Sequence, residues 1–437
     1  MSDQDNSLDN TTNSKTNSKY TAKSEIERIF SVFETFNKNA EDIKSSSANN
    51  ALSDYEPILT MSSIGQLGRF GNQLFQYAFL RICAEVSGAR VECPPWIGQS
   101  LFGHRDATIT KRLPPAIEQK NDEETLFDVI PEFIPYLEKL AKAKSIRVGA
   151  EALTSGINNV DLWGFFQFHS QVFRPYREYF CSLFQPADDL KLAVEDGLNI
   201  LRSKGKSIVG IHIRRGDYIT EPRVGFTLVF PSKWYCQWLE GVWDELEDPV
   251  LFLCSDELEL ILPGFEKFAP ITLKDLNVKL PDRIKNLNVE FYIDFFMLSH
   301  CDVVCTSNSN FSFAACMLND CGKMFVRPHW DFSTKFAVFD PWDSEPLLWL
   351  GGKQPKFLKS LADVLYITYV TQGIWAMLKS VFVFVPKSHI KMLGLRIYLS
   401  YQVQGFIGVF KSLLYTLGWH SSWQQLNKDI LMRRQDC

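Results

Sequence analysis

The sequence predicts an α/β protein, because apolar strands alternate with helices and carry polar residues at their carboxyl ends. The clearest strand is 208–213, a nearly unbroken apolar run rich in β-branched residues that stops abruptly at Arg214. Such a run is typical of a parallel strand buried on both faces. Two observations agree with it. Residues 57–94 form a β–loop–α–β pattern, and the apolar runs at 250–254 and 302–306 also end in polar residues.

The amino-terminal residues 1–55 are expected to lie outside the folded body. Residues 1–20 are rich in Asn, Ser, Asp and Thr, a composition typical of disorder, and Ser24 with Glu27 forms a capping-box pattern for one short amphipathic helix. The segment contains no apolar core of a secretory signal. Ten cysteines are scattered through the chain, several in apolar runs, which favours buried thiols in a reducing compartment. We therefore expect a cytoplasmic protein.

The first folded domain, predicted at residues 56–180, opens with a glycine-rich loop between a strand and a helix. The loop carries Gly65, Gly68 and Gly71, and the helix ends at Gly88. Glycines let a backbone pass close to a ligand, and the amino terminus of a helix suits an anion. The spacing is not the dinucleotide fingerprint and no Walker lysine follows it. The loop by itself does not identify a ligand.

The second folded domain, predicted at residues 181–345, gathers polar side chains at the ends of its strands. In open α/β sheets, ligands bind at the carboxyl ends of parallel strands. Adjacent arginines suit a diphosphate, because each offers a planar fork of donors. Two alternatives stay open: the arginines pair locally with acids in a solvated turn, or Ser309 merely caps a helix. The strand-end residues are His212, Arg214, Arg215, Asp217, Ser255, Asp256, Ser307, Asn308 and Ser309.

Five motifs in one order resemble the α-1,2-fucosyltransferases of glycosyltransferase family 11, and more distantly the α-1,6- and protein O-fucosyltransferases. The motifs span residues 58–345 and are GRFGNQLFQYA at 68–78, WGFFQ at 163–167, HIRRGDY at 212–218, VLFLCSDE at 250–257 and NSNFSFAA at 308–315. The resemblance implies two Rossmann-like domains facing a cleft, the GT-B type, with GDP-fucose bound mainly by the second domain. Where the family has paired tryptophans, this chain has Phe313 and Ala314, which leaves the acceptor and the linkage open.

The resemblance also implies roles for individual residues. Arg214 is expected to bind the β-phosphate with support from His212 and Arg215, and Asp256 is expected to accept hydrogen bonds from guanine N1 and N2. The first domain would close over the diphosphate or the fucose, and a helix amino terminus in the second domain would face the anion. The residues expected to close over the ligand are Gly68, Gly71 and Asn72. The residues expected at the helix amino terminus are Asn308 and Ser309.

The acidic residues of the sequence indicate a candidate general base and whether a metal ion is needed. Asp217 and Glu221 follow the arginines, and Glu221 is preferred, because two neighbouring guanidinium groups make Asp217 a weak base. The only D-x-D pair is Asp3 and Asp5, in the amino-terminal tail. We therefore expect no metal and no cofactor beyond the donor substrate, with arginine balancing the charge of the departing diphosphate.

The sequence thus predicts an inverting fucosyltransferase that moves fucose from GDP-fucose to a galactose-type hydroxyl of a glycan, in α-1,2 linkage. One alternative changes the linkage or the nucleotide-sugar donor. The other is a non-catalytic protein that binds a nucleotide sugar or a glycan. The net charge of −5 makes nucleic acid an unsuitable partner for this body.

The carboxyl-terminal residues 346–437 are expected to form a helical extension. Apolar stretches occupy 364–385 and 393–418, and from Lys353 onward eight Lys and three Arg outweigh three Asp, so that 11 − 3 = +8. Apolar helices with basic residues favour attachment to an anionic membrane surface, on the inner face for a cytoplasmic protein. The alternative is a helical subdomain packed on the body.

Overall fold

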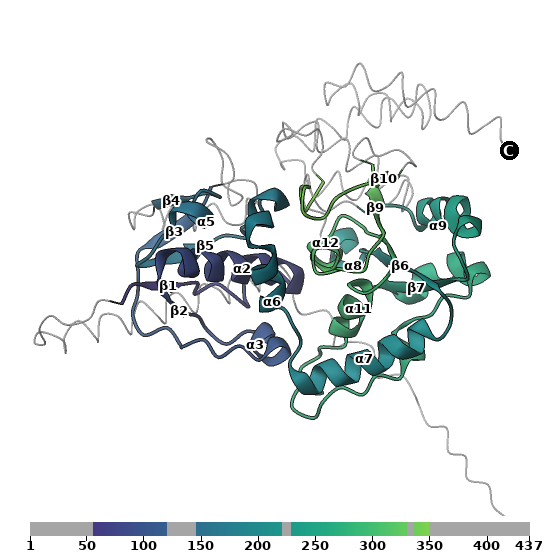
Figure 1. Cartoon of the computed structure of the whole chain (residues 1–437), viewed down its shortest axis with the longest axis horizontal. Coiled ribbons are helices and arrows are strands. Elements are labelled where there is room, and N and C mark those ends of the chain that lie inside the picture. Colours follow the sequence, from purple (N-terminus) through teal and green to yellow (C-terminus); the bar gives the residue numbers. More distant parts are fainter. Residues whose placement is uncertain (1–55, 120–145, 221–228, 330–335, 349–437) are drawn as a thin grey trace, which may run out of the picture. The chain divides into compact units, whose positions relative to one another are not determined.

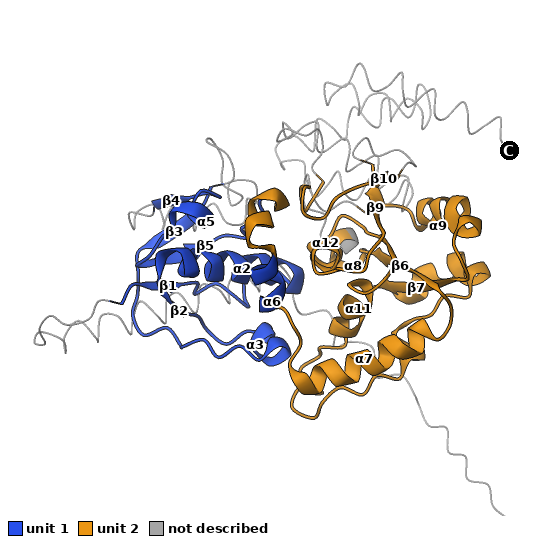
Figure 2. Ribbon diagram, in the orientation of Figure 1, with its two compact units in different colours: residues 1–168, 178–183 blue, residues 169–177, 184–437 orange. Residues whose placement is uncertain are grey.

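The computed structural model describes residues 56–119, 146–220, 229–329 and 336–348 (Figure 1). The chain divides into two compact units (Figure 2). Unit 1 comprises Met1–Phe168 and Glu178–Leu183, and unit 2 comprises His169–Arg177 and Phe184–Cys437. The predicted α/β class is confirmed, because each unit holds a five-stranded sheet whose strands are parallel or mostly parallel. The predicted domain limits and the cleft between two Rossmann-like domains stay predictions.

Unit 1 is built on a fully parallel sheet with the strand order β2-β1-β5-β3-β4. The β–loop–α–β pattern of the sequence is present as β1, α2 and β2. Its elements are β1 (Ile58–Thr60), α2 (Phe70–Ser87), β2 (Arg90–Glu92), α3 (Ile97–Phe102), β3 (Pro115–Glu118), β4 (Ile146–Val148), α5 (Ala152–Ser155), β5 (Val160–Trp163) and most of α6 (Arg177–Leu183).

Helix α2 is the main helix of unit 1, and its composition explains its burial. Leu74, Phe75, Ala78 and Phe79 lie in the core, and the buried positions reach around most of the helix. A helix that is apolar on nearly all sides belongs inside a domain. It ends at Gly88, whose φ of 62° is the left-handed conformation that glycine adopts most readily at a helix end.

Unit 2 is built on a sheet with the order β10-β9-β8-β6-β7, in which only β10 is antiparallel to its neighbour. Its strands are β6 (Ser207–Ile213), β7 (Pro249–Ser255), β8 (Val303–Cys305), β9 (Met324–Pro328) and β10 (Phe336–Val338). Its helices are α7 (Asp188–Arg202), α8 (Gly216–Thr220), α9 (Ser232–Val242), α10 (Leu258–Ile261), α11 (Phe291–Leu298) and α12 (Asn310–Met317). Short 3₁₀ segments lie at Ser170–Tyr176, Trp243–Glu245, Leu262–Phe268 and Leu273–Leu276.

Strand β6 lies between β7 and β8 and has apolar side chains on both faces. Val209, Ile211 and Ile213 point into one core cluster with residues of β7 and α9. On the other face a Cβ at Gly210 would lie 2.7 Å from the Cys301 Sγ, so glycine allows the close approach of the segment after α11. The β-branched run was correctly predicted to be a strand buried on both faces.

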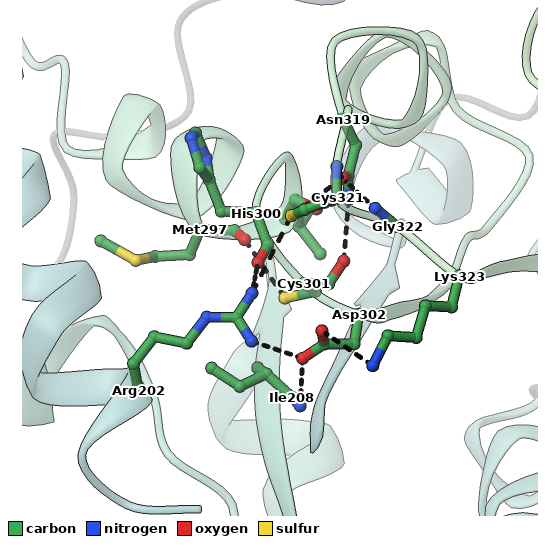
Figure 3. A network of polar contacts seen from close by, with 11 residues as sticks. Arg202, Ile208, Met297, His300, Cys301, Asp302, Asn319, Cys321, Gly322 and Lys323 are labelled. Atoms are coloured by element: carbon green, nitrogen blue, oxygen red, sulfur yellow. Dashed lines mark hydrogen bonds and ion pairs between the residues drawn. The ribbon is translucent and has the colours of Figure 1, made fainter. Parts of the chain in front are cut away.

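The amino-terminal edge of the unit 2 sheet is fixed by a polar network (Figure 3). The Asp302 Oδ2 accepts from the Arg202 Nη1 at 2.5 Å and from the Ile208 backbone N at 2.8 Å. Arg202 also donates to the His300 carbonyl oxygen. The network ties the end of α7 to the starts of β6 and β8. It lies at the edge opposite the carboxyl ends of the strands, so its role is structural.

Each sheet has a topological switch point, the place where successive connections leave in opposite directions. In unit 2 the chain passes from β6 to β7 on one side and later returns to β8 on the other side. In unit 1 the strands β2 and β5 lie on opposite sides of β1. Ligands of open α/β sheets bind at the carboxyl ends of strands at such points.

The structure does not test the predicted carboxyl-terminal extension or the predicted amino-terminal helix. Among the described residues, no helix has the length and apolar character needed to cross a membrane. The carboxyl-terminal stretches 364–385 and 393–418 lie outside the described residues, as does the amino-terminal helix predicted around Ser24. The helical extension and its membrane attachment therefore stay predictions.

Candidate active site

Hydroxyl groups join the carboxyl ends of three adjacent strands of unit 2, β8, β6 and β7. The Ser307 Oγ, which follows β8, accepts from the Arg214 backbone N at 3.1 Å and lies 3.1 Å from the His212 Nδ1. On the other side, the Ser255 Oγ donates to the Ile213 carbonyl oxygen at 2.7 Å. The strand-end residues that the sequence predicted are therefore brought together at the switch point of the unit 2 sheet.

His212 is buried at this point and stays neutral near pH 7. Burial, followed by the charge of Arg214, lowers the pKa of its imidazole to about 3. Its ring lies against Phe311, with 5.1 Å between the ring centroids. A neutral imidazole can hydrogen-bond, but it cannot add positive charge for a diphosphate. His212 is linked to the Arg214 backbone through the Ser307 hydroxyl.

The Arg214 guanidinium is held between two carboxylates. Its Nη1 lies 2.7 Å from the Asp256 Oδ2, and its Nη2 forms an ion pair with Asp217. The Cζ atom lies 5.2 Å from the centre of the Tyr218 ring, within the range of a cation–π contact. The side chain is only 13% exposed. Arg214 is therefore positioned rigidly before any ligand arrives.

Arg215 is also paired, so the two arginines are not free cations. Its Nε lies 3.0 Å from the Glu257 Oε2, and its backbone N donates to the Asp256 Oδ1 at 2.8 Å. Two arginines and three carboxylates give this cluster a formal charge of 2 − 3 = −1. The structure thus shows the local pairing that the sequence left open as an alternative. An anion must compete with a carboxylate to bind here.

Gly216 makes the close approach of Asp256 possible. Its φ is +31°, and a Cβ at this position would lie 2.5 Å from the Asp256 Oδ2. A side chain at position 216 would displace the carboxylate that contacts both arginines. The glycine in the sequence Arg-Arg-Gly-Asp is therefore required by the geometry of the ion pairs.

At the amino terminus of α12, the residues predicted to bind the anion form hydrogen bonds within the protein. The Ser309 Oγ accepts from the Phe311 backbone N at 3.3 Å, which is the capping role that the sequence left open. The Asn308 Nδ2 donates to the Leu348 carbonyl oxygen at 3.1 Å, and its Oδ1 accepts from the Leu348 backbone N at 2.6 Å. Asn308 thus anchors the segment around Leu348 to the switch point.

Phe313 lies in the core of unit 2, where it is 2% exposed. Its ring packs against Phe339, with 5.8 Å between the centroids, and the neighbouring Ala314 is fully buried. The side chains at the positions of the family's paired tryptophans therefore contribute to packing in this chain.

Asp294 is a residue that the sequence reasoning missed. It lies in the first turn of α11, which leads into β8 and therefore has its amino end at the carboxyl edge of the sheet. Burial raises the pKa of the Cys254 thiol on β7, and the nearby Asp294 and Asp256 carboxylates raise it further, so both carboxyls lie near this strand. The feature of the sequence that could have identified Asp294 is a single acidic residue within the apolar run FYIDFFML.

Burial raises the pKa of Asp294 to about 7. The Asp294 carboxyl makes no hydrogen bond to another residue of the described ranges. A half-buried carboxyl without a partner is costly once it ionises, so this group is suited to accept donors from a ligand.

The residues predicted in unit 1 lie together around the glycine-rich loop. Gly68 has a φ of +76°, and a Cβ there would lie 2.3 Å from the Asn72 Nδ2 and 2.9 Å from the Phe165 Cε1. Gly71 and Asn72 belong to the first turn of α2. The start of the loop is held by Asp161, whose Oδ2 accepts from the Ser62 Oγ at 2.6 Å.

Two expectations about catalysis are not decided by this geometry. Glu221, the preferred general base, lies outside the described residues. The other candidate, Asp217, is paired with Arg214. Within the described ranges, no group of three or more His, Cys, Asp or Glu side chains is arranged to hold a metal ion. Independence from metal stays a prediction.

The family model of glycosyl transferase family 11 matches residues 45–337. No curated protein matches the chain. Among solved structures, the chain is similar to the α-1,6-fucosyltransferase NodZ of Bradyrhizobium soaked with GDP-fucose, at 13% identity and a TM-score of 0.43, covering 65% of this chain and 99% of NodZ. It is also similar to POFUT1 in complex with GDP-fucose, at 13% identity and a TM-score of 0.36, covering 63% and 97%. A mutant of Arabidopsis thaliana FUT1 in complex with GDP matches at 12% identity and a TM-score of 0.37, covering 70% and 78%.

The match to the family model covers well over half of the chain. It includes the glycine-rich loop of unit 1 and the strand ends of unit 2 that carry Arg214 and Asp256. The predicted family is therefore confirmed, and the chain belongs to glycosyl transferase family 11.

Proposed function

We propose that the protein transfers fucose from GDP-fucose to a galactose-type hydroxyl of a glycan, in α-1,2 linkage and with inversion at the anomeric carbon. Membership of glycosyl transferase family 11 supports glycosyl transfer. The resemblance of the five motifs to α-1,2-fucosyltransferases supports the donor and the linkage. The observation that carries the proposal is the rigid Arg214 guanidinium at the switch point of the unit 2 sheet.

In the proposed reaction, Arg214 holds the diphosphate as it departs. A guanidinium has five N–H donors, and the two ion pairs with Asp217 and Asp256 leave others for phosphate oxygens. Asp256 also accepts from the Arg215 backbone N, so we assign it the structural role. Asp217 is then the carboxylate that the diphosphate displaces. Arginine takes the role that a divalent cation has in other transferases.

The displaced carboxylate has a chemical use. The acceptor hydroxyl oxygen forms a bond to the anomeric carbon while the bond from that carbon to the diphosphate oxygen breaks. The hydroxyl proton passes to a carboxylate, and GDP leaves with the electron pair of the broken bond. Asp217, released from Arg214, and Glu221 are the two candidates for that base. Until the donor is bound, the Asp217 carboxylate is occupied by its ion pair with Arg214.

The proposed recognition of guanine differs from the one that the sequence suggested. Asp256 was expected to accept from guanine N1 and N2, but its carboxylate oxygens contact the Arg214 guanidinium and the Arg215 backbone N. Asp294 offers a half-buried carboxyl at the same strand end. We assign the guanine contact to Asp294, whose ionised form can accept from both donors of the base.

A glycan-acceptor array with GDP-fucose, followed by linkage analysis of the product, tests this function. The proposal expects a fucosylated galactoside with the new bond at the 2-hydroxyl. A product with another linkage supports the first alternative. Release of GDP from GDP-fucose, even slow, excludes a protein that only binds nucleotide sugars. The absence of both transfer and release would contradict the proposal.

A further inference from the structure

Residues 340–348 form a connecting segment, here called the strap, that is bonded to both ends of α12. Most of its side chains are buried, although it belongs to no helix or strand. Near its start, the Trp342 Nε1 donates to the carbonyl oxygen of Met317, the last residue of α12, at 3.1 Å. At its end, Leu348 is bonded to Asn308, which lies two residues before α12 begins. The strap therefore spans α12 from one end to the other.

The Leu348 end of the strap is fixed at the strand ends that carry the proposed donor site. Asn308 is buried and precedes the turn that begins α12, and the neighbouring Ser307 Oγ accepts from the Arg214 backbone N at 3.1 Å. The Asn308 amide uses both its oxygen and its nitrogen for the Leu348 backbone. The Leu348 side chain lies in the same core cluster as Ile213 of β6. A displacement of Leu348 would therefore reach the turn that carries Arg214.

The middle of the strap is bonded to segment 169–177 by three hydrogen bonds between two serines. The Ser170 backbone N and Oγ donate to the Ser344 carbonyl oxygen at 2.9 and 3.0 Å, and the Ser344 backbone N donates to the Ser170 Oγ at 2.9 Å. The Ser170 hydroxyl takes part in two of the three bonds, whereas Ser344 contributes only backbone atoms. Both residues are buried, so loss of the hydroxyl would leave the Ser344 N–H without its partner, which is costly.

The place of Ser170 in the chain gives this contact a second consequence. Segment 169–177 belongs to unit 2, but the residues on either side of it, Phe168 and Glu178, belong to unit 1 (Figure 2). Because the segment is joined to unit 1 at both ends, it must follow any change in the placement of that unit. Arg177 of the segment also contacts the strap, with its Cζ 5.4 Å from the centre of the Trp342 ring.

The strap has little slack between its two contacts. Only three residues separate Ser344 from Leu348. Of these, Pro346 has a fixed φ and Leu347 is buried. The Glu345 carbonyl oxygen accepts from an arginine side chain of β9 at 2.6 Å. A movement of Ser344 is therefore passed on to Leu348 and is not absorbed by the chain between them.

We propose that the strap positions the donor site of unit 2, and that the Ser170 hydroxyl and the Asn308 amide are positioning groups for donor binding. A change in the placement of unit 1 reaches Ser170 through segment 169–177. The strap carries it from Ser344 to Leu348, and so to Asn308 beside the ion-pair cluster. The proposal rests on the proposed function for the identity of the ligand. Because coupling is reciprocal, donor binding also stabilises the contact between the two serines.

Calorimetric titration of GDP tests the strap in the wild-type protein, in Ser170→Ala, Asn308→Ala and their double variant, and in Ser344→Ala. The first substitution removes two of the three bonds between the serines. Ser344→Ala is the matched control, because the bonds of Ser344 are made by its backbone. Thermal unfolding of each protein identifies a temperature at which all of them are folded.

We expect Ser170→Ala to bind GDP about five-fold more weakly, the lower end of typical coupling between distant sites. Ser344→Ala should bind GDP as the wild-type protein does. In the Asn308→Ala background, Ser170→Ala should weaken binding by less than about two-fold, because the link is already broken. A purely structural Ser170 would lower the stability and leave GDP affinity unchanged. That result overturns the strap, as does an equal loss in both backgrounds.

Hydrogen exchange of the wild-type protein gives a second test that needs no substitution. GDP should slow exchange of the Ser170 and Ser344 backbone amides, which donate across the contact. Unchanged exchange at both amides overturns the proposal even if Ser170→Ala does not fold, and so does a wild-type protein that binds no GDP. Failure of the proposed function shows itself separately, as a lack of transfer and of GDP release from GDP-fucose.

Discussion

At the scale of single residues, the account depends on Arg214 and on the carboxylates around it. The two ion pairs hold the guanidinium rigidly, and rigid donors stabilise developing charge without reorganisation. Together with the pair of Arg215 and Glu257, they give the cluster a formal charge of −1. In the proposed function, donor binding is therefore an exchange, in which phosphate oxygens replace one carboxylate. This distinguishes the site from a simple basic patch.

The exchange predicts an unusual effect of Asp217→Asn. Removing the carboxylate that competes with phosphate should tighten GDP binding by roughly 1 kcal/mol, about five-fold in the dissociation constant. Calorimetric titration of GDP into both proteins measures this. Glu257→Gln, at the ion pair of Arg215, is a matched control. Weaker GDP binding by Asp217→Asn would show instead that Asp217 holds Arg214 in place in the complex.

Asp294 predicts a pH-dependent stability. Its folded-state pKa of about 7 lies above the ordinary value of an Asp carboxyl. Between those two pH values the folded protein keeps a proton that the unfolded chain has released, so the contribution of this group is present at low pH and is lost as pH rises to 7. Asp294→Asn should therefore raise the free energy of unfolding more at pH 8 than at pH 5, by on the order of 2 kcal/mol.

Urea denaturation at the two pH values measures that difference. The same variant should bind GDP more weakly at pH 8, because it lacks the carboxylate that accepts from guanine. An equal stability change at pH 5 and pH 8 would mean that Asp294 titrates normally. Undiminished GDP affinity would remove the guanine assignment but not the stability argument.

At the scale of elements, three adjacent strands of unit 2 were predictable from sequence. The run 208–213 is β6, and the runs 250–254 and 302–306 are β7 and β8. Strands buried on both faces leave continuous apolar runs, which a sequence displays clearly. In unit 1, β3 and β4 were not predicted, because Pro115–Glu118 contains a proline and Ile146–Val148 is only three residues long.

The site could be predicted as a set of residues, but not as a set of contacts. That the ends of β6, β7 and β8 meet follows from the general position of ligands in parallel sheets. The pairing of Arg214 with Asp256 depends on the register that sets Ile213 opposite Ser255, which no local pattern encodes. Asp294 was missed because its helix carries no motif. Its position depends on how α11 packs beside β6 and β7.

The turn after β6 gives a prediction for a glycine substitution. In Gly216→Ala the new Cβ would lie 2.5 Å from the Asp256 Oδ2, so the carboxylate has to leave Arg214 and the Arg215 backbone. We expect GDP affinity to fall at least ten-fold. Gly241→Ala in α9 is the control, because a Cβ there meets nothing within 4 Å.

The control should stabilise the protein by about 0.5–1 kcal/mol and leave GDP binding unchanged, because alanine is the better helix former. Thermal unfolding measures the stability of both variants, and calorimetric titration measures their GDP affinity. Normal GDP affinity in Gly216→Ala would show that the Asp256 contacts are not needed for binding.

At the scale of the whole molecule, both units carry polar groups at the carboxyl edge of a parallel sheet, but of different kinds. In unit 2 the groups are ion pairs around Arg214. In unit 1 they are buried amides around the glycine-rich loop. Charged groups suit a diphosphate.

The distribution of charge over the chain gives a prediction about membranes. Residues 353–437 carry +8, so the rest of the chain carries −5 − 8 = −13. Any attraction to an anionic surface must then come from these residues, at about 1 kcal/mol for each basic residue near the surface. The full-length protein should co-sediment with vesicles containing phosphatidylserine, and less so at high salt.

A chain truncated before Lys353 serves as the comparison and should stay in the supernatant while it still binds GDP. If the full-length protein ignores the vesicles, or if the truncated chain loses GDP binding, the extension is a subdomain packed on the body.

The central claim is that Arg214 holds the diphosphate of the donor. The most direct test compares GDP with guanosine, which lacks the diphosphate, in calorimetric titrations of the wild-type protein, Arg214→Ala and Arg214→Lys. The account predicts that the wild-type protein prefers GDP strongly, and that either substitution removes most of this preference, by about 2–4 kcal/mol, because a lysine cannot replace the planar fork. Guanosine binding should change little. A preference for GDP that survives in Arg214→Ala would contradict the account.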